Sequence, residues 1–269
     1  MILRSLSPPA PAPEMPDQEM EAIWPAIERS QQQDFSPGCW LIPQPSHAAL
    51  AGDIARELDP QSFPGITAEV AHAIALHDAG WSLDDAAIIQ ESRAKGMHAK
   101  PYPFLKALPI DTAAAWVASI EIAGKAAPIG GYLVSRHFAA IGENYRSKAE
   151  ATADTKTAAV LERFLQQEKY RQQKLRKNLL HSDDELDRMV AALQFCDLLS
   201  LYISCGLAGE VEFPQQIAGK SIRLHRVNDG VSLTPSPLAK DATFSVAGLR
   251  HPRTPPDSSR TFTLQVRRP

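Results

Sequence analysis

The stretch MVAALQFCDLLSLYISCGLAG, residues 189–209, decides how the rest of the sequence is interpreted. Its apolar residues fall on almost every side of a helix, which predicts a helix buried at the centre of the protein. The preceding Ser182-Asp-Asp-Glu185 has the pattern of a capping box, and Gly206 marks the end of the helix.

Asp197 is the most informative residue of this helix, because it is the only charged residue between Arg188 and Glu210. A carboxylate that is buried without a partner costs several kcal/mol or loses its charge. We therefore expect a metal ion, another cation or a set of hydrogen-bond donors beside Asp197. A salt bridge to an arginine in the core is the structural alternative to a metal.

His77 and Asp78 are the first candidate partners of Asp197. The run ITAEVAHAIALHDAGW, residues 66–81, predicts a helix that Gly80 closes, so the pair lies at the C-terminal end of that helix. Adjacent imidazole and carboxylate groups can bind one divalent ion. The alternative is a helix-terminal imidazole that meets free carbonyl groups.

His47 is the third candidate partner. It follows the predicted strand CWLIPQ, residues 39–44, and lies in the first turn of a helix predicted over about 47–58. A lone histidine at a helix start is ordinarily a surface or capping residue, so a ligand role depends on the other three residues. The predicted metal ligands are His47, His77, Asp78 and Asp197.

The remaining sequence predicts further helices and then short strands. Proline and glycine in residues 82–110 indicate a loop that covers a pocket. Helical patterns follow from Asp111 or Thr112 to about Ala127, after Pro128, and twice within 156–205. Beyond Gly206, runs such as SIRLHRV and RTFTLQV predict a small sheet that N-terminal strands could join.

These elements predict a mainly α-helical fold with a small β appendage. We expect a proline-rich N-terminal segment over 1–36, a helical metal-binding domain over 37–206 and a β-rich C-terminal appendage over 207–269.

The overall charge excludes some partners. The sequence has 28 basic and 31 acidic residues and a net charge of -3, so neither a nucleic-acid polymer nor a membrane is an expected partner. The three cysteines form no CxxC pair, which is typical of a reducing compartment. We find no signal peptide and no segment that approaches the ~20 apolar residues of a membrane span, and we expect a cytoplasmic protein. The sequence is compatible with a homodimer.

Three motifs carry a resemblance to a known superfamily. They are QPSHAALAG at 44–52, LHDAGW at 76–81 and YLVSRHF at 132–138. With Asp197, they resemble the HD-domain superfamily of metal-dependent phosphohydrolases, and more narrowly an uncharacterised bacterial family placed in it. The later LTPSPL, residues 233–238, is similar to that family as well. The resemblance covers about 37–265 and implies an HD-domain-like helical bundle.

The resemblance also implies a function. It suggests an enzyme that hydrolyses a small-molecule phosphoester, a nucleotide being one candidate, through a metal-activated water. The cofactor would be one or two divalent ions of Mn, Mg, Ni, Zn or Fe. His137 would ligate a second ion that Asp78 bridges, and Arg136 would contact phosphate. The implied catalytic residues are therefore Asp78, His137 and Arg136.

Two other functions remain open from the sequence. Some HD-fold enzymes use a similar ligand set for oxygen chemistry, so a di-iron oxygenase is one alternative. A non-catalytic nucleotide-binding or signalling module is the other, because one scaffold supports several functions. His137 itself could also be a hydrogen-bonded core residue with no role in either.

Overall fold

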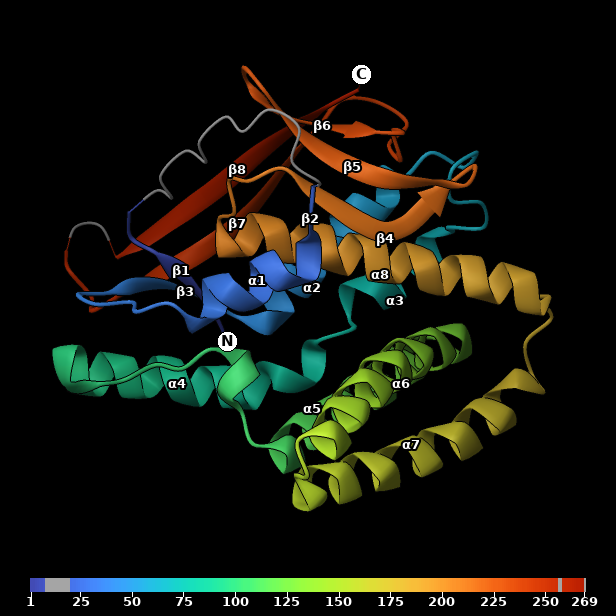
Figure 1. Ribbon diagram of the computed structural model, residues 1–269, viewed down its shortest axis with the longest axis horizontal. Helices are drawn as coiled ribbons and strands as arrows, with labels where there is room; N and C mark the ends of the chain where they lie inside the picture. The colour runs from blue at the N-terminus through green and yellow to red at the C-terminus, as the bar shows by residue number, and fades with distance from the viewer. Residues whose placement is uncertain (8–19, 256–257, 269) are drawn as a thin grey trace.

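The computed structural model describes residues 1–7, 20–255 and 258–268 (Figure 1). The proline-rich stretch at 8–16 therefore lies outside the described residues. The protein is 56% helical and contains an eight-stranded mixed sheet that is curled into a half-barrel. Helix α8, Asp183–Cys205, lies under this curled sheet and contacts β1, β4, β7 and β8.

The sheet combines strands from both ends of the chain. Its order is β1-β3-β7-β8-β6-β5-β4-β2, so strands from the N-terminal region form both edges. Most neighbours are antiparallel, whereas the β2–β4 and β6–β8 pairs are parallel. The strands are β1 Ile2–Ser5, β2 Glu21–Ala22, β3 Cys39–Ile42, β4 Val211–Ile217, β5 Lys220–Val227, β6 Gly230–Thr234, β7 Ala242–His251 and β8 Ser259–Arg267.

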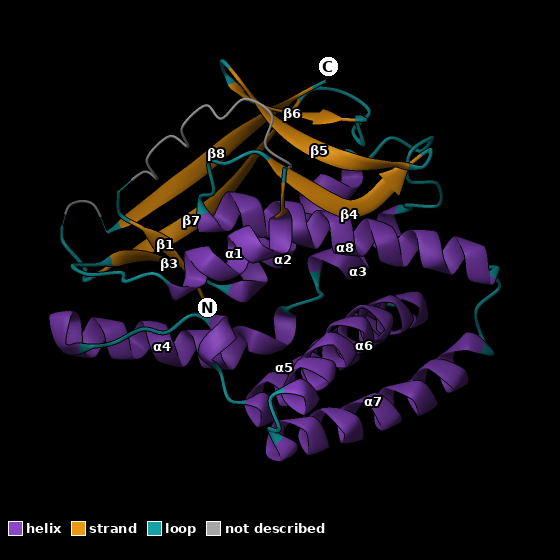
Figure 2. Cartoon of the chain, in the orientation of Figure 1, coloured by secondary structure: helices purple, strands orange, loops and turns teal. Residues whose placement is uncertain are grey.

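The helices form two groups below the sheet (Figure 2). Helices α1, α2 and α3 pack against α8 close to the sheet, whereas α5 to α7 lie farther from the sheet and reach α8 through α6. The helices other than α8 are α1 Ile23–Gln32, α2 Gln44–Arg56, α3 Ala68–Ala75, α4 Ser82–Lys95, α5 Pro109–Ala126, α6 Pro128–Ala151 and α7 Thr155–Arg176, with short 3-10 turns η1 Ala79–Trp81, η2 Gly96–His98 and η3 Phe104–Lys106.

The predicted mainly α-helical fold with a small β appendage is wrong, because the sheet is a large part of the structure. The C-terminal strands are long and pair with N-terminal ones: Cys39 on β3 lies opposite His251 on β7. The pattern of each short apolar run predicts only the structure of that run, whereas the size of a sheet depends on pairings between distant segments. The strands within 1–36 and 207–269 therefore belong to one sheet.

Two predicted element boundaries also need correction. The expected loop over 82–110 contains helix α4, which ends at Gly96, while the prolines fall in the part after it. The helix expected over 66–81 is shorter, since α3 ends at Ala75. His77 and Asp78 consequently lie in the turn that follows α3.

Helix α8 has the ends that the sequence predicts. The Ser182 side chain accepts a hydrogen bond from the Glu185 N–H and the Glu185 side chain accepts one from the Ser182 N–H, which completes the capping box, and Gly206 caps the other end. Contrary to expectation, α8 is long and apolar enough to cross a membrane, but 78% of its apolar window is buried within the protein. That burial is consistent with the core helix of a soluble protein.

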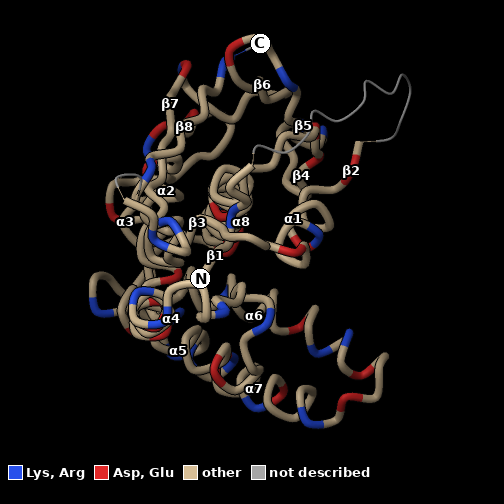
Figure 3. The backbone as a smooth tube through the Cα atoms, turned by 90° about the vertical axis from the view of Figure 1, so that its left-hand side faces the viewer, with Lys and Arg blue, Asp and Glu red and all other residues tan. Residues whose placement is uncertain are grey.

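Charged residues of both signs line α7, on the outside of the second helical group (Figure 3). Its buried residues are few, namely Leu161, Phe164 and Glu168. This mixture of charges is the arrangement expected of a solvated helix face.

Candidate metal centre

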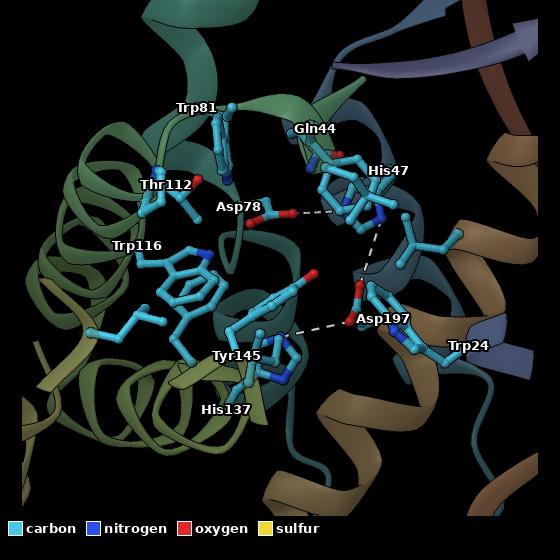
Figure 4. A pocket seen from close by; sticks show the side chains of 18 of the residues that line it. Trp24, Gln44, His47, Asp78, Trp81, Thr112, Trp116, His137, Tyr145 and Asp197 are labelled. Carbon is cyan, nitrogen blue, oxygen red and sulfur yellow. Dashed lines mark hydrogen bonds and ion pairs between the residues drawn. The ribbon is translucent and has the colours of Figure 1, made fainter. Parts of the chain in front are cut away.

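Four separate parts of the chain bring the predicted ligands together (Figure 4). His47 lies in the first turn of α2, His137 in the middle of α6 and Asp197 in the middle of α8. His77 and Asp78 come from the turn after α3. All five residues are buried, the most exposed being Asp197 at 8%.

The side chains face one another across short distances. The His47 Nε2 atom lies 2.8 Å from the Asp78 Oδ2 atom, and the His77 Nε2 atom lies 3.3 Å from the Asp197 Oδ1 atom. His137 Nε2 is 3.6 Å from the other oxygen of Asp197. Ligand atoms lie within 4.8 Å of one another in each of two groups that share His77, namely His47, His77, Asp78 and His77, His137, Asp197. This spacing would allow several of these side chains to bind the same metal ion.

Ser200 fixes which nitrogen of His47 faces the cluster. Its hydroxyl donates to the backbone oxygen of Asp197 at 2.8 Å, so it must accept the hydrogen bond that joins it to His47 Nδ1, also 2.8 Å long. The Nδ1 atom of His47 therefore carries a proton, and Nε2 is the atom directed at Asp78. Hydrogen bonds of this kind orient metal-binding histidines in many proteins.

His77 is oriented in the same way by the protein backbone. Its Nδ1 lies 2.8 Å from the carbonyl oxygen of Ile74, which can only accept a hydrogen bond, so Nδ1 is the donor. The remaining ring nitrogen, Nε2, faces both Asp197 and Asp78. His77 can thus offer one ligand atom and no more.

The two carboxylates set the charge of this cluster. Burial alone would lower the pKa of His77, but Asp78 and Asp197 outweigh it and raise that pKa to about 9. Burial likewise opposes the charge on Asp197, yet the His77 hydrogen bond and the charges of the surrounding histidines lower its pKa to about 2. A metal that binds His77 at neutral pH must therefore displace a proton.

His137 differs from the other two histidines. Burial is the main cause that lowers its pKa to about 4, so the ring is neutral at neutral pH. Its Nδ1 atom is buried and has no hydrogen-bond partner among the described residues. Nothing described holds His137 in one orientation as Ser200 and Ile74 hold His47 and His77.

The turn that carries Asp78 is locked onto helix α5. The Gly80 N–H donates to the Ser119 hydroxyl at 2.9 Å, and that hydroxyl donates to the carbonyl oxygen of Ala115 at 3.0 Å. A Cβ atom on Gly80 would lie 2.1 Å from the same carbonyl oxygen, far inside van der Waals contact. The turn can approach α5 this closely only because residue 80 is glycine.

A cavity of about 190 Å³ opens above the cluster. His47, Asp78, His137 and Asp197 line it, whereas His77 does not, so an ion held by all of them would be reached from the cavity side. Figure 4 shows Trp81 and Trp116 on one side of this cavity and His47 and Asp197 on the other, with the Tyr145 hydroxyl directed into the space between. The other aromatic lining residues are Trp24, Phe104 and Phe138.

Arg136 does not join the site. Its guanidinium donates to Asp187 at 2.8 Å and to the Tyr132 hydroxyl at 2.9 Å, and it is not among the residues that line the cavity. Arg136 and His137 are adjacent on α6, and adjacent helical residues point about 100° apart. The predicted phosphate contact therefore has no support in this geometry.

The sequence reasoning also missed residues that shape the site, above all Ser200 and Ser119. Ser200 could have been found, because it lies three residues after Asp197 and so shares its side of the helix. Ser119 and the aromatic lining give no comparable signal, since they reach the site only through tertiary packing.

We expect Ser200→Ala to weaken metal binding by about 10- to 100-fold, the usual cost of losing a hydrogen bond behind a metal-binding histidine. Ser204→Ala is the matched control, because Ser204 lies one turn farther along α8, is equally buried and has no partner for its hydroxyl among the described residues. Competition with a chelator of known affinity measures the metal affinity of both variants. Equal affinities in the two variants would contradict the role of Ser200.

Comparison with known proteins corrects the resemblance inferred from the motifs. No curated protein and no solved structure matches this chain. The expected HD-domain membership is wrong, because the family that matches is one of unknown function and the helices that carry the candidate ligands pack under a half-barrel sheet. The match spans residues 30–250, and the chain belongs to the family described as "Protein of unknown function (DUF3891)".

Proposed function

We propose that this protein is a cytoplasmic hydrolase that uses one divalent metal ion to cleave a small phosphoester with water. One observation carries the proposal: the Nδ1 atoms of His47 and His77 are held by hydrogen bonds, so that their Nε2 atoms face two carboxylates at the base of a cavity. Two carboxylates are buried among three imidazoles, and neither lysine nor arginine is among the described residues that line the cavity. A divalent cation would balance these carboxylates in place of the proton that His77 otherwise holds.

The donor set indicates the kind of ion. His47, His77 and His137 offer nitrogen, and Asp78 and Asp197 offer oxygen. Mixed ligands of this type suit zinc, manganese, nickel or iron, whereas magnesium prefers oxygen ligands and bound water. His137, whose Nδ1 atom has no hydrogen-bond partner among the described residues, is expected to contribute the least of the five to affinity.

The geometry favours one ion over two. Both groups of candidate ligands depend on the same His77 Nε2 atom, and an imidazole nitrogen binds one metal. If an ion takes that atom, a second ion would be left with His47 or His137 and a shared carboxylate. Such a set is too small for a stable second site.

The reaction needs little beyond positioning. A divalent ion held by the three histidines and two aspartates would lower the pKa of a water molecule to near neutral and offset charge on the phosphoryl oxygens. The water oxygen bonds to phosphorus as the bond to the leaving oxygen breaks; one proton ends on the leaving group and the other stays on the product. Trp81 and Trp116 exclude bulk water from one side of the cavity.

Elemental analysis of the purified protein, followed by an assay with aryl phosphoesters, tests the proposal. We expect one bound ion per chain and metal-dependent release of the aryl alcohol. His77→Ala is expected to lose the bound ion and the hydrolysis. His72→Ala, at an exposed position on neighbouring α3, is expected to retain the ion and the hydrolysis.

Other results would point to the alternative functions. Two iron ions per chain would contradict the one-ion hydrolase and favour an oxygenase. One ion per chain without hydrolysis of any phosphoester would favour a non-catalytic binding module.

A further inference from the structure

The walls of the cavity carry information about what enters it. Apart from Asp78, Asp197 and the two histidines, the lining side chains are uncharged, and neither lysine nor arginine is among those described. The aromatic side chains Trp24, Trp81, Phe104, Trp116, Phe138 and Tyr145 make up much of the surface. Pockets of this composition bind organic groups through apolar contact and a few neutral hydrogen bonds.

The charges at the site limit the charge of the ligand. Asp78 and Asp197 together carry two negative charges, which one divalent ion would neutralise. A phosphate monoester has a second pKa near 6 and so carries about two negative charges at neutral pH. In a cavity without lysine or arginine, that charge has no further partner, and a buried charge without a partner is costly. A phosphodiester carries a single negative charge and meets less opposition.

The size of the cavity limits the organic group. Its volume of about 190 Å³ is below the roughly 300–1,000 Å³ of ordinary small-molecule sites. A nucleotide has a base, a ribose and a phosphate, and these need more enclosed space than this. A single flat ring beside the metal fits both the volume and the aromatic walls.

From these three observations we infer that the site takes a small phosphodiester with one negative charge and a flat, uncharged organic group. The inference rests on the proposed function, for which it names the substrate class. Trp81, Trp116 and Tyr145 hold the organic group, and the Tyr145 hydroxyl, which is directed into the cavity, donates a hydrogen bond to an oxygen of the ligand. Burial raises the pKa of Tyr145 to about 12, so the hydroxyl keeps its proton.

Binding of three aryl and nucleotide phosphates to the metal-loaded protein tests the inference without any need for turnover. Tryptophan fluorescence reports occupancy, because Trp24, Trp81 and Trp116 line the cavity. At pH 8 we expect methyl phenyl phosphate, a diester with the same single ring, to bind about tenfold or more tightly than phenyl phosphate, as one unpaired charge predicts, and more tightly than AMP. Equal or tighter binding of phenyl phosphate or AMP would overturn the inference.

A charge added to the wall tests the cause of the preference. Thr112 lines the cavity, whereas Thr155 is exposed at the start of α7 and does not. Thr112→Lys is expected to reduce the preference for methyl phenyl phosphate over phenyl phosphate about threefold or more. Thr155→Lys, which adds the same charge outside the cavity, is expected to leave it unchanged. The same preference in both variants would show that charge does not set the selectivity.

Turnover separates this inference from the proposed function. Hydrolysis of both methyl 4-nitrophenyl phosphate and 4-nitrophenyl phosphate, with the monoester preferred, would overturn the inference and leave the hydrolase standing. Hydrolysis of neither would overturn the hydrolase, while the order of binding would still decide the ligand class.

Discussion

Asp197→Asn is expected to abolish metal binding and with it any hydrolysis. Asparagine has the same shape as aspartate, so the packing of α8 is kept, but the charge that attracts the cation is lost. Asp197 contacts both His77 and His137, at 3.3 and 3.6 Å, so its loss affects two other ligands as well. Elemental analysis after dialysis measures the bound metal, and circular dichroism verifies the fold.

Asp187→Asn is the matched control for this experiment. Asp187 lies on the same helix, its side chain is 59% exposed, and it pairs with Arg136 away from the cavity. We expect this variant to bind metal like the unaltered protein. Undiminished metal content in Asp197→Asn would mean that the carboxylate is not a ligand, and the proposed centre would have to be abandoned.

Gly80→Ala is expected to lower the free energy of unfolding by about 3 kcal/mol, the upper part of the range for overpacked sites. The added Cβ would lie 2.1 Å from the Ala115 carbonyl oxygen and 2.6 Å from the Ser119 nitrogen, and neither backbone atom can move alone. The turn must shift away from α5 and take Asp78 with it. Denaturant unfolding measures the stability, and chelator competition measures the accompanying loss of metal affinity.

Gly124→Ala, farther along α5, separates a steric effect from a general effect of the substitution. A Cβ there would lie 3.4 Å from the nearest atom, Gly131 Cα, which is ordinary contact. Alanine also favours a helix by up to about 1 kcal/mol over glycine, so this variant is expected to be at least as stable as the parent. If Gly80→Ala were as stable as Gly124→Ala, the contact with α5 would not be what positions the turn.

The site was largely predictable from the sequence because its signals are local. A single carboxylate within a long apolar helix requires a partner wherever the helix is placed, and Asp197 is such a residue. An adjacent histidine and aspartate that precede a glycine suggested that partner. The structure brings these residues together as expected, with His47 and His137 beside them.

The fold was less predictable because it depends on distant pairings. No local pattern shows that β3 pairs with β7, or that Ser119 on α5 holds the turn at Gly80. The aromatic wall is another case, since Trp116 and Tyr145 have the spacing of ordinary core residues on their own helices. Resemblance at a few motifs also gave the wrong superfamily, because the motifs contain the candidate metal ligands and not the strands of the sheet around them.

The arrangement of the sheet has a consequence for how the protein folds during synthesis. Strands β1 and β3 leave the ribosome well before β7. Strand β7, which pairs with β3, is complete only at His251. The opposite edge depends on an equally distant pairing, between Glu21 and Val211. Closing such long loops is slow, and unpaired strand edges are prone to aggregation while they wait. The half-barrel can therefore close only after strand β8, Ser259–Arg267, has been made.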